Sequence, residues 1–185
     1  MINKEIIIEQ TKKWINDVVI GCNFCPFAAK EVKRGSIHYE ILATTNLKEI
    51  LEKISFAFLY LNENPEVETT LLILPEGFSS FNSYLNLFDY AESLLKKDGY
   101  EGIYQVAGFH PNYVFAGSTD DDPANFTNRS PYSILQLLRE ASISKATDNF
   151  PGIKNIPKKN IAYATKMGLN YMQLLKDSCI NLNDP

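Results

Sequence analysis

Two cysteines three positions apart are the residues with the clearest potential for chemistry. Cys22 and Cys25 follow an amphipathic helical pattern and stand directly before Pro26. This spacing lets two sulfurs face one point, where they can bind a metal ion or exchange a disulfide. Alternatively, both are small apolar residues that pack beside Phe24 and Phe27. The spacing leaves these three alternatives open.

A metal site would need ligands from elsewhere in the chain. His110 could be a third ligand beside Cys22 and Cys25, with water or a carboxylate from the run 120–122 as the fourth, which is the arrangement of a catalytic zinc site. The cofactor is unknown from the sequence, with zinc or iron as the candidates. An iron–sulfur cluster held by cysteine alone needs four thiolates, and the chain has 3 cysteines, so such a cluster would have to be shared between two copies.

His110 and Glu76 each follow an expected strand. Pro111 restricts the backbone at His110 to extended conformations, so the imidazole could serve as a general base, a metal ligand or a hydrogen-bond donor, or it could cap a turn. Glu76 follows the apolar run 69–74. If the strands before these two residues are parallel neighbours, both side chains leave the same edge of the sheet. We therefore predict that Cys22, Cys25, His110 and Glu76 are catalytic.

Arg129, with its neighbours Asn128 and Ser130, is the candidate substrate-binding group. Ser130 and Pro131 have the pattern of a helix start, and free N–H groups there favour an anion that a guanidinium could clamp. The alternative is an arginine that bridges the acidic run 120–122 within the loop.

The periodicity of the remaining chain predicts the elements that must position these residues. Apolar residues at helical spacing predict five longer helices and a short turn after Pro26. Apolar or alternating runs predict strands. A polar loop at 117–129 and a connector at 146–156 complete the chain. The helices are expected at 5–19, 47–61, 81–95, from Ser130 past Ala141, and from Pro157 to Asp177; the strands at 37–42, 69–74 and 102–109, with a further one at 113–116.

Strands that alternate with helices predict a sheet covered by helices. The expected fold class is α/β, or α+β with a ferredoxin-like arrangement. Its sheet would be small and mixed, with about three to four strands and about five covering helices. The whole chain, residues 1–185, is expected to form one globular domain.

Composition narrows the class of partner. The net charge of −4 argues against nucleic acid and a polybasic membrane surface. No apolar run approaches the roughly 20 residues of a membrane span, and the first residues lack the layout of a signal peptide. The expected location is cytoplasmic, and a homodimer is compatible with the sequence. The odd number of cysteines does not suit a secreted disulfide framework.

Three segments together resemble a known family. They are 22–28 around the cysteine pair, 109–117 around His110, and 128–140 with Asn128, Arg129, Ser130 and Arg139. These segments are similar to those of the bacterial family catalogued as domain of unknown function 1415. The resemblance covers nearly the whole chain and implies a single-domain bacterial protein, but it implies no activity.

The leading hypothesis is therefore an enzyme for a small anionic metabolite. Its pocket would combine the cysteine pair with His110, Glu76 and Arg129, and the chemistry would be carried by a thiol or a metal ion. In this reading Cys22 is the nucleophile or first ligand and Cys25 the resolving or second ligating thiol. The alternatives are a non-catalytic metal- or ligand-binding module and a structural or interaction protein with buried, inert cysteines.

Overall fold

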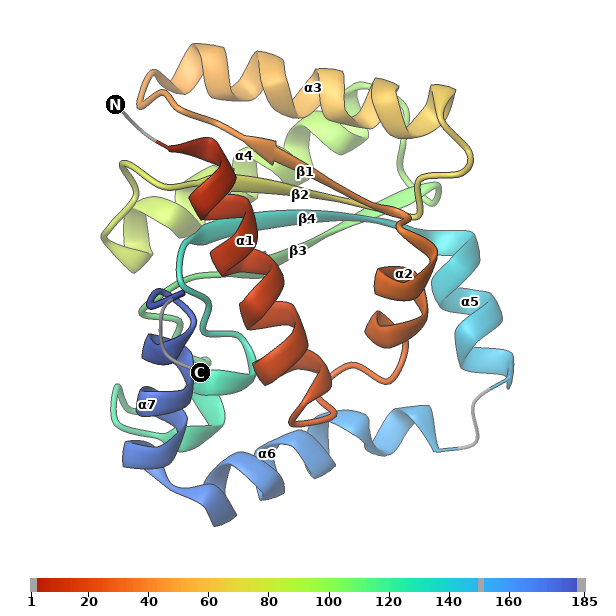
Figure 1. Ribbon diagram of the computed structural model, residues 1–185. Coiled ribbons are helices and arrows are strands. Elements are labelled where there is room, and N and C mark those ends of the chain that lie inside the picture. Colours follow the sequence, from red (N-terminus) through yellow and green to blue (C-terminus); the bar gives the residue numbers. More distant parts are fainter. Residues whose placement is uncertain (1–2, 150–151, 183–185) are drawn as a thin grey trace.

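A mixed four-stranded sheet is the centre of the fold. The computed structural model describes residues 3–149 and 152–182. Its sheet has the order β1-β2-β4-β3, with β1 parallel to β2 and with β4 antiparallel to both of its neighbours (Figure 1). The strands are β1 (Ile37–Ile41), β2 (Thr69–Leu74), β3 (Tyr104–Phe109) and β4 (Ser133–Arg139).

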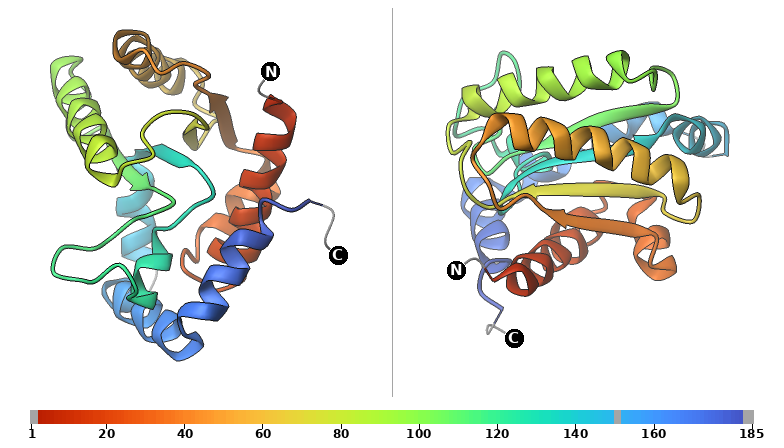
Figure 2. Two further views of the ribbon diagram at one scale, coloured as in Figure 1. Left: turned by 90° about the vertical axis from the view of Figure 1, so that its left-hand side faces the viewer. Right: turned by 90° about the horizontal axis from the view of Figure 1, so that it is seen from above.

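Two long helices cover one face of this sheet. α3 (Leu47–Glu63) connects β1 to β2, and α4 (Phe81–Lys97) connects β2 to β3. Asn46 starts α3, because its side chain accepts hydrogen bonds from the N–H groups of Lys48 and Glu49. Both helices lie on the same side of the sheet (Figure 2). The apolar stripes of α3 and α4 and the facing residues of the strands form the first core, which includes Ile50, Phe58, Leu72, Tyr84, Leu87 and Leu135.

The other face is covered by the two ends of the chain. α1 (Lys4–Trp14) runs on into a π-helical turn (Ile15–Ile20), and a short turn then leads to α2 (Ala28–Arg34). α6 (Ile156–Met167) and α7 (Leu169–Ser178) return to the same side, as Figure 2 shows. The second core lies here and includes Trp14, Val18, Cys22, Ile73, Phe126, Ile134 and Met172.

The segment expected as a helix after Ser130 is a central strand instead. Residues 133–139 form β4 between β2 and β3. The prediction was wrong because adjacent apolar residues such as Ile134 and Leu135 resemble one side of a helix. In a strand covered on both faces, consecutive side chains are buried in opposite directions, and here the two residues belong to different cores. α5 (Glu140–Asn149) begins only after this strand.

Smaller corrections concern the loops. The strand expected at 113–116 is irregular chain between two turns, in which Tyr113 N–H donates to His110 O and Phe115 N–H donates to the Asn125 side chain. The polar loop contains a 3₁₀ helix (Pro123–Thr127), and most of the described connector residues are helical. Gly168, at φ +83°, divides the last helix into α6 and α7.

The mixed α/β sheet is confirmed, and the chain follows the α/β alternative. The order from β1 to β4 is strand, helix, strand, helix, strand, strand, whereas a ferredoxin-like unit places two strands between its helices. The described residues form seven α-helices, more than expected. None of the helices in the described part of the chain is sufficiently long and apolar to span a bilayer.

Candidate functional site

The turn that contains Cys22 and Cys25 is hydrogen-bonded to the C-terminal end of the π-helical turn. Cys22 N–H donates to Val18 O at 3.0 Å, and Cys25 N–H donates to Val19 O at 3.3 Å. Asn23 between them adopts the left-handed conformation, with φ +55°, which asparagine tolerates. A helix C-terminus carries a partial negative charge, so the backbone beside Cys22 does not favour a thiolate.

The thiols of Cys22 and Cys25 differ in how far they are buried. Cys22 is 6% exposed, whereas Cys25 is half-buried. Burial raises the pKa of Cys22, and its hydrogen bond with Tyr163 opposes that rise. Cys179 is fully buried, and burial raises its pKa to about 11. All three thiols are free, and because Cys22 and Cys179 are buried, Cys25 is the most accessible of them.

His110 is fully buried and has both ring nitrogens engaged. Nδ1 accepts the N–H of Asn112 at 3.0 Å, so Nε2 carries the proton and donates to Phe78 O at 2.8 Å. The ring packs against Phe81 and Tyr84 of α4. His110 therefore fastens the loop after β3 to the loop after β2.

This burial predicts a pH-dependent stability. Burial lowers the pKa of His110, and the positive charge of Lys176 lowers it further, against the opposing effect of the bond to Phe78. The unfolded chain then binds a proton at higher pH than the folded one, so stability is retained above the usual histidine pKa near 6.5 and falls as the pH drops below it. Urea denaturation at pH 7 and pH 5.5 should show a loss of stability in the parent protein.

A variant without the imidazole separates this effect from other titrations. His110→Gln should lose stability at pH 7 but show a smaller further loss at pH 5.5, because the titrating group is gone. An equal pH dependence in the parent and His110→Gln would contradict the assignment.

Arg129 is engaged by the loop that precedes it. It is 8% exposed, its Nε–H donates to Tyr113 O at 3.0 Å, and its Nη2–H donates to Asp120 O at 2.7 Å. The guanidinium lies 4.8 Å from the ring centroid of Phe126. Burial lowers the pKa of Arg129, and the charge of Asp120 opposes this. Since β4 follows, the expected helix N-terminus is absent, and the loop-bridging alternative describes the geometry.

The neighbours of Arg129 have similar roles. The Asn128 side chain donates to Gly108 O at 3.2 Å, and the Asn128 carbonyl accepts the N–H of His110. The Ser130 hydroxyl is buried and donates to Tyr132 O. These contacts hold residues 109–130, called the 109–130 loop below, against the sheet.

Two residues that sequence reasoning missed complete this loop. Asn125 is fully buried, accepts from Phe115 N–H and donates to Thr119 O. Trp14 donates its indole N–H to Arg129 O at 3.1 Å. The signal for Asn125 was its position in a long polar loop, where an amide can replace backbone partners; the partner of Trp14 had no local signal.

Glu76 lies in the exposed loop between β2 and α4. Gly77 and Phe78 follow it with φ +74° and +50°, a left-handed conformation that is strained for phenylalanine. β2 and β3 are parallel to each other but not neighbours, because β4 lies between them. Their loops nevertheless meet, through the bond from His110 to Phe78 O.

The expected pocket residues therefore divide into two groups. His110, Arg129, Asn128 and Ser130 belong to the 109–130 loop, whereas Cys22 packs in the second core near Tyr163. Among the residues that the structure describes, no group of three or more His, Cys, Asp or Glu side chains could hold a metal ion. The ligand set Cys22, Cys25 and His110 is not assembled.

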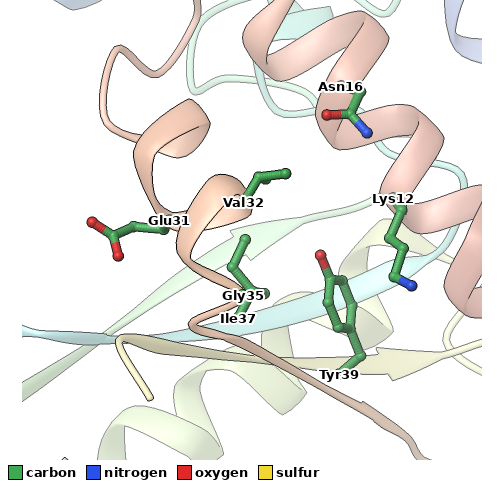
Figure 3. A pocket seen from close by; sticks show the side chains of 7 residues that line it. All are labelled: Lys12, Asn16, Glu31, Val32, Gly35, Ile37 and Tyr39. Carbon is green, nitrogen blue, oxygen red and sulfur yellow. The ribbon is translucent and has the colours of Figure 1, made fainter. Parts of the chain in front are cut away.

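A surface hollow of about 260 Å³ lies between α1 and α2 over β1 (Figure 3). Its lining includes Lys12, Asn16 and Tyr39, and the Tyr39 ring stands between the two helices. Burial, with the charge of Glu9, raises the pKa of Tyr39 to about 12, so this phenol stays protonated. The hollow was not expected from the sequence, because its residues come from three separate elements.

Comparison with known proteins identifies the family of the chain but no activity. No curated protein and no solved structure matches the chain. The family described as "Protein of unknown function (DUF1415)" matches residues 6–174, which is nearly the whole chain. The chain belongs to the DUF1415 family.

Proposed function

We propose that the protein is a cytoplasmic thiol–disulfide oxidoreductase for a small, anionic disulfide. Cys25 is the attacking thiol and Cys22 the resolving thiol. One observation carries this proposal: two free thiols share one turn, and only the second is accessible. The roles of the two cysteines are thus the reverse of those expected from the sequence alone.

The reaction would proceed in two balanced exchanges. The Cys25 thiolate attacks one sulfur of the disulfide R–S–S–R, that S–S bond breaks, and the first R–SH leaves with the proton that Cys25 lost. Cys22 then attacks the Cys25 sulfur of the mixed disulfide and releases the second R–SH. The dithiol loses two electrons, which the substrate gains.

The surroundings favour thiol chemistry over the alternatives. The pair provides two sulfur ligands without a third protein ligand at hand in the described residues, which disfavours the metal-binding module. The α2 residues Lys30 and Lys33, close to Cys25 along the chain and exposed, would attract an anionic disulfide. His110 and Arg129 are left out of the reaction because their polar groups are already bonded.

Alkylation of the native protein tests the accessible thiol. With iodoacetamide and peptide mass spectrometry, Cys25 should react at least roughly tenfold faster than Cys22 or Cys179, since a local opening that costs about 1.4 kcal/mol already slows a buried group tenfold. Equal rates at Cys22 and Cys25 would contradict the assigned roles. No reaction at any cysteine would favour buried, inert thiols.

Oxidised glutathione tests the two-step exchange. The parent protein should form a Cys22–Cys25 disulfide without retaining glutathione. Cys22→Ser should retain one glutathione on Cys25, and Cys25→Ser should form neither product. Cys179→Ser is the matched control and should behave like the parent. A glutathione adduct that persists equally in the parent and in Cys22→Ser would overturn the resolving role.

A further inference from the structure

The edge strand β1 has one unpaired side. Leu42 N–H donates to Ile73 O, and Ser36 O accepts from Glu68 N–H, so the even-numbered residues of this segment face β2. The N–H and C=O groups of Ile37, Tyr39 and Ile41 therefore point away from the sheet. Among the strands of residues 3–149 and 152–182, β1 pairs with β2 alone, so these groups have no partner in the sheet. Figure 2 shows β1 at the outer edge, between α3 and α1.

Two surface hollows flank this strand, one on each face of the sheet. The first is the hollow of about 260 Å³ between α1 and α2, which includes Ile37 and Tyr39. The second, of about 280 Å³, lies between β1 and α3 and includes His38 and Glu40. Its α3 wall consists of Glu63 and three exposed apolar or aromatic residues: Phe56 is 64%, Leu59 42% and Tyr60 37% exposed. An edge strand with open space on both faces is a template for another strand.

We infer that a second copy of this chain occupies the edge, with its own β1 antiparallel and a twofold axis at Tyr39. Tyr39 then faces Tyr39 of the second copy, and Ile37 faces Ile41. These are the residues whose N–H and C=O groups point outward, so each facing pair exchanges both backbone hydrogen bonds. The two sheets become one continuous sheet, and neither edge stays unpaired.

Side-chain hydrogen-bonding groups select this register, because an imidazole N–H can donate to a carboxylate. His38 and Glu40 lie between the bonded pairs, where facing side chains are closest. An axis at Tyr39 places His38 of each copy opposite Glu40 of the other. An axis at Glu40 would oppose two carboxylates, and an axis at His38 would oppose two imidazoles. Of these three axes, only the one at Tyr39 places an imidazole opposite a carboxylate, and it does so in two symmetry-related pairs.

The exposed residues of α3 fit the same arrangement. His38 packs on Tyr60 with ring centroids 4.4 Å apart, and Glu40 lies 3.8 Å from Lys53, so both β1 side chains are directed toward α3. In the dimer, the α3 helices of the two copies approach each other on this face. Phe56 then fills the hollow beside the strand, which accounts for a phenylalanine that is largely exposed in a single chain.

Charge reversal tests the register in solution. The parent should sediment as a dimer of twice 21.0 kDa. His38→Glu opposes carboxylates twice, and Glu40→Lys removes both attractions, so each should raise the dimer Kd at least about tenfold. The double variant His38→Glu/Glu40→Lys restores opposite charges across the axis and should return the Kd toward the parental value. Circular dichroism should show the parental fold in all three variants.

A second pair of variants tests the apolar contact. Phe56→Ser should weaken the dimer, whereas Leu174→Ser on α7, where the leucine is 71% exposed, should not. If the parent protein stays monomeric at about 100 µM, its dimer Kd is about 10⁻⁴ M or weaker. That result would overturn the inference. A dimer that is indifferent to His38→Glu and Glu40→Lys, or single variants that the double variant does not rescue, would overturn it equally.

Discussion

Replacing Trp14 by alanine is expected to lower the free energy of unfolding by about 4 kcal/mol. Trp14 is 2% exposed, and its ring meets Phe109 edge-on with centroids 5.1 Å apart. Its indole N–H also donates to Arg129 O at 3.1 Å. The substitution thus leaves a cavity in the second core and removes the direct tie between α1 and the 109–130 loop. In a chain of this size, the melting temperature should fall by roughly 10 °C.

Trp14→Phe divides this effect into its two parts. Phenylalanine keeps most of the apolar volume but cannot donate to the Arg129 carbonyl, so a loss of about 1 kcal/mol is expected. Urea denaturation followed by far-UV circular dichroism measures both variants, because Trp14 is the only tryptophan and fluorescence is lost with it. Equal losses in the alanine and phenylalanine variants would show that packing at this position contributes little.

Replacing Arg129 by methionine is expected to cost about 3 kcal/mol, since hydrogen bonds from charged donors are strong and buried carbonyls are costly to leave unpaired. The carbonyls of Tyr113 and Asp120 would lose their donor. Methionine has similar length and replaces part of the contact with Phe126, so the loss reports mainly on the polar interactions. Trp14 fluorescence follows unfolding here and also reports on the neighbouring backbone.

Arg34→Met is the matched control for Arg129. The Arg34 side chain is 50% exposed and is 3.1 Å from a carboxylate oxygen of Glu31. Exposed pairs of this kind contribute about 0–1 kcal/mol, so a change of at most that size is expected. If Arg129→Met were no more destabilising than Arg34→Met, the 109–130 loop would not depend on the guanidinium.

These results would assign the 109–130 loop a scaffolding role. His110, Asn125 and Arg129 are each buried and each bond two backbone groups; His110 reaches the loop after β2, whereas Asn125 and Arg129 bond groups within the 109–130 loop. Long loops need such partners, because a buried backbone group without a hydrogen bond is costly. The residues that had the character of an active site therefore position the loop, and the accessible thiol lies in another part of the molecule.

Local patterns by themselves determined most of the elements and the fold class. The apolar stripe from Leu47 to Leu61 and the cap at Asn46 predicted α3, and the β-branched run before Pro75 predicted β2. Both rest on interactions within one segment, or on burial that the pattern itself encodes. The cysteine spacing and the alternation at 37–42 were visible in the same way.

Only the tertiary structure decided which side chains meet and which stay accessible. Residues 133–139 became a strand because β2 and β3 supply partners and both faces are covered. His110 became structural because a carbonyl of the loop after β2 satisfies it, and Arg129 because carbonyls of its own loop do. Cys25 rather than Cys22 stayed accessible because the second core packs over Cys22. Pairing and burial of this kind join segments that are far apart in the chain, and no local pattern records those contacts.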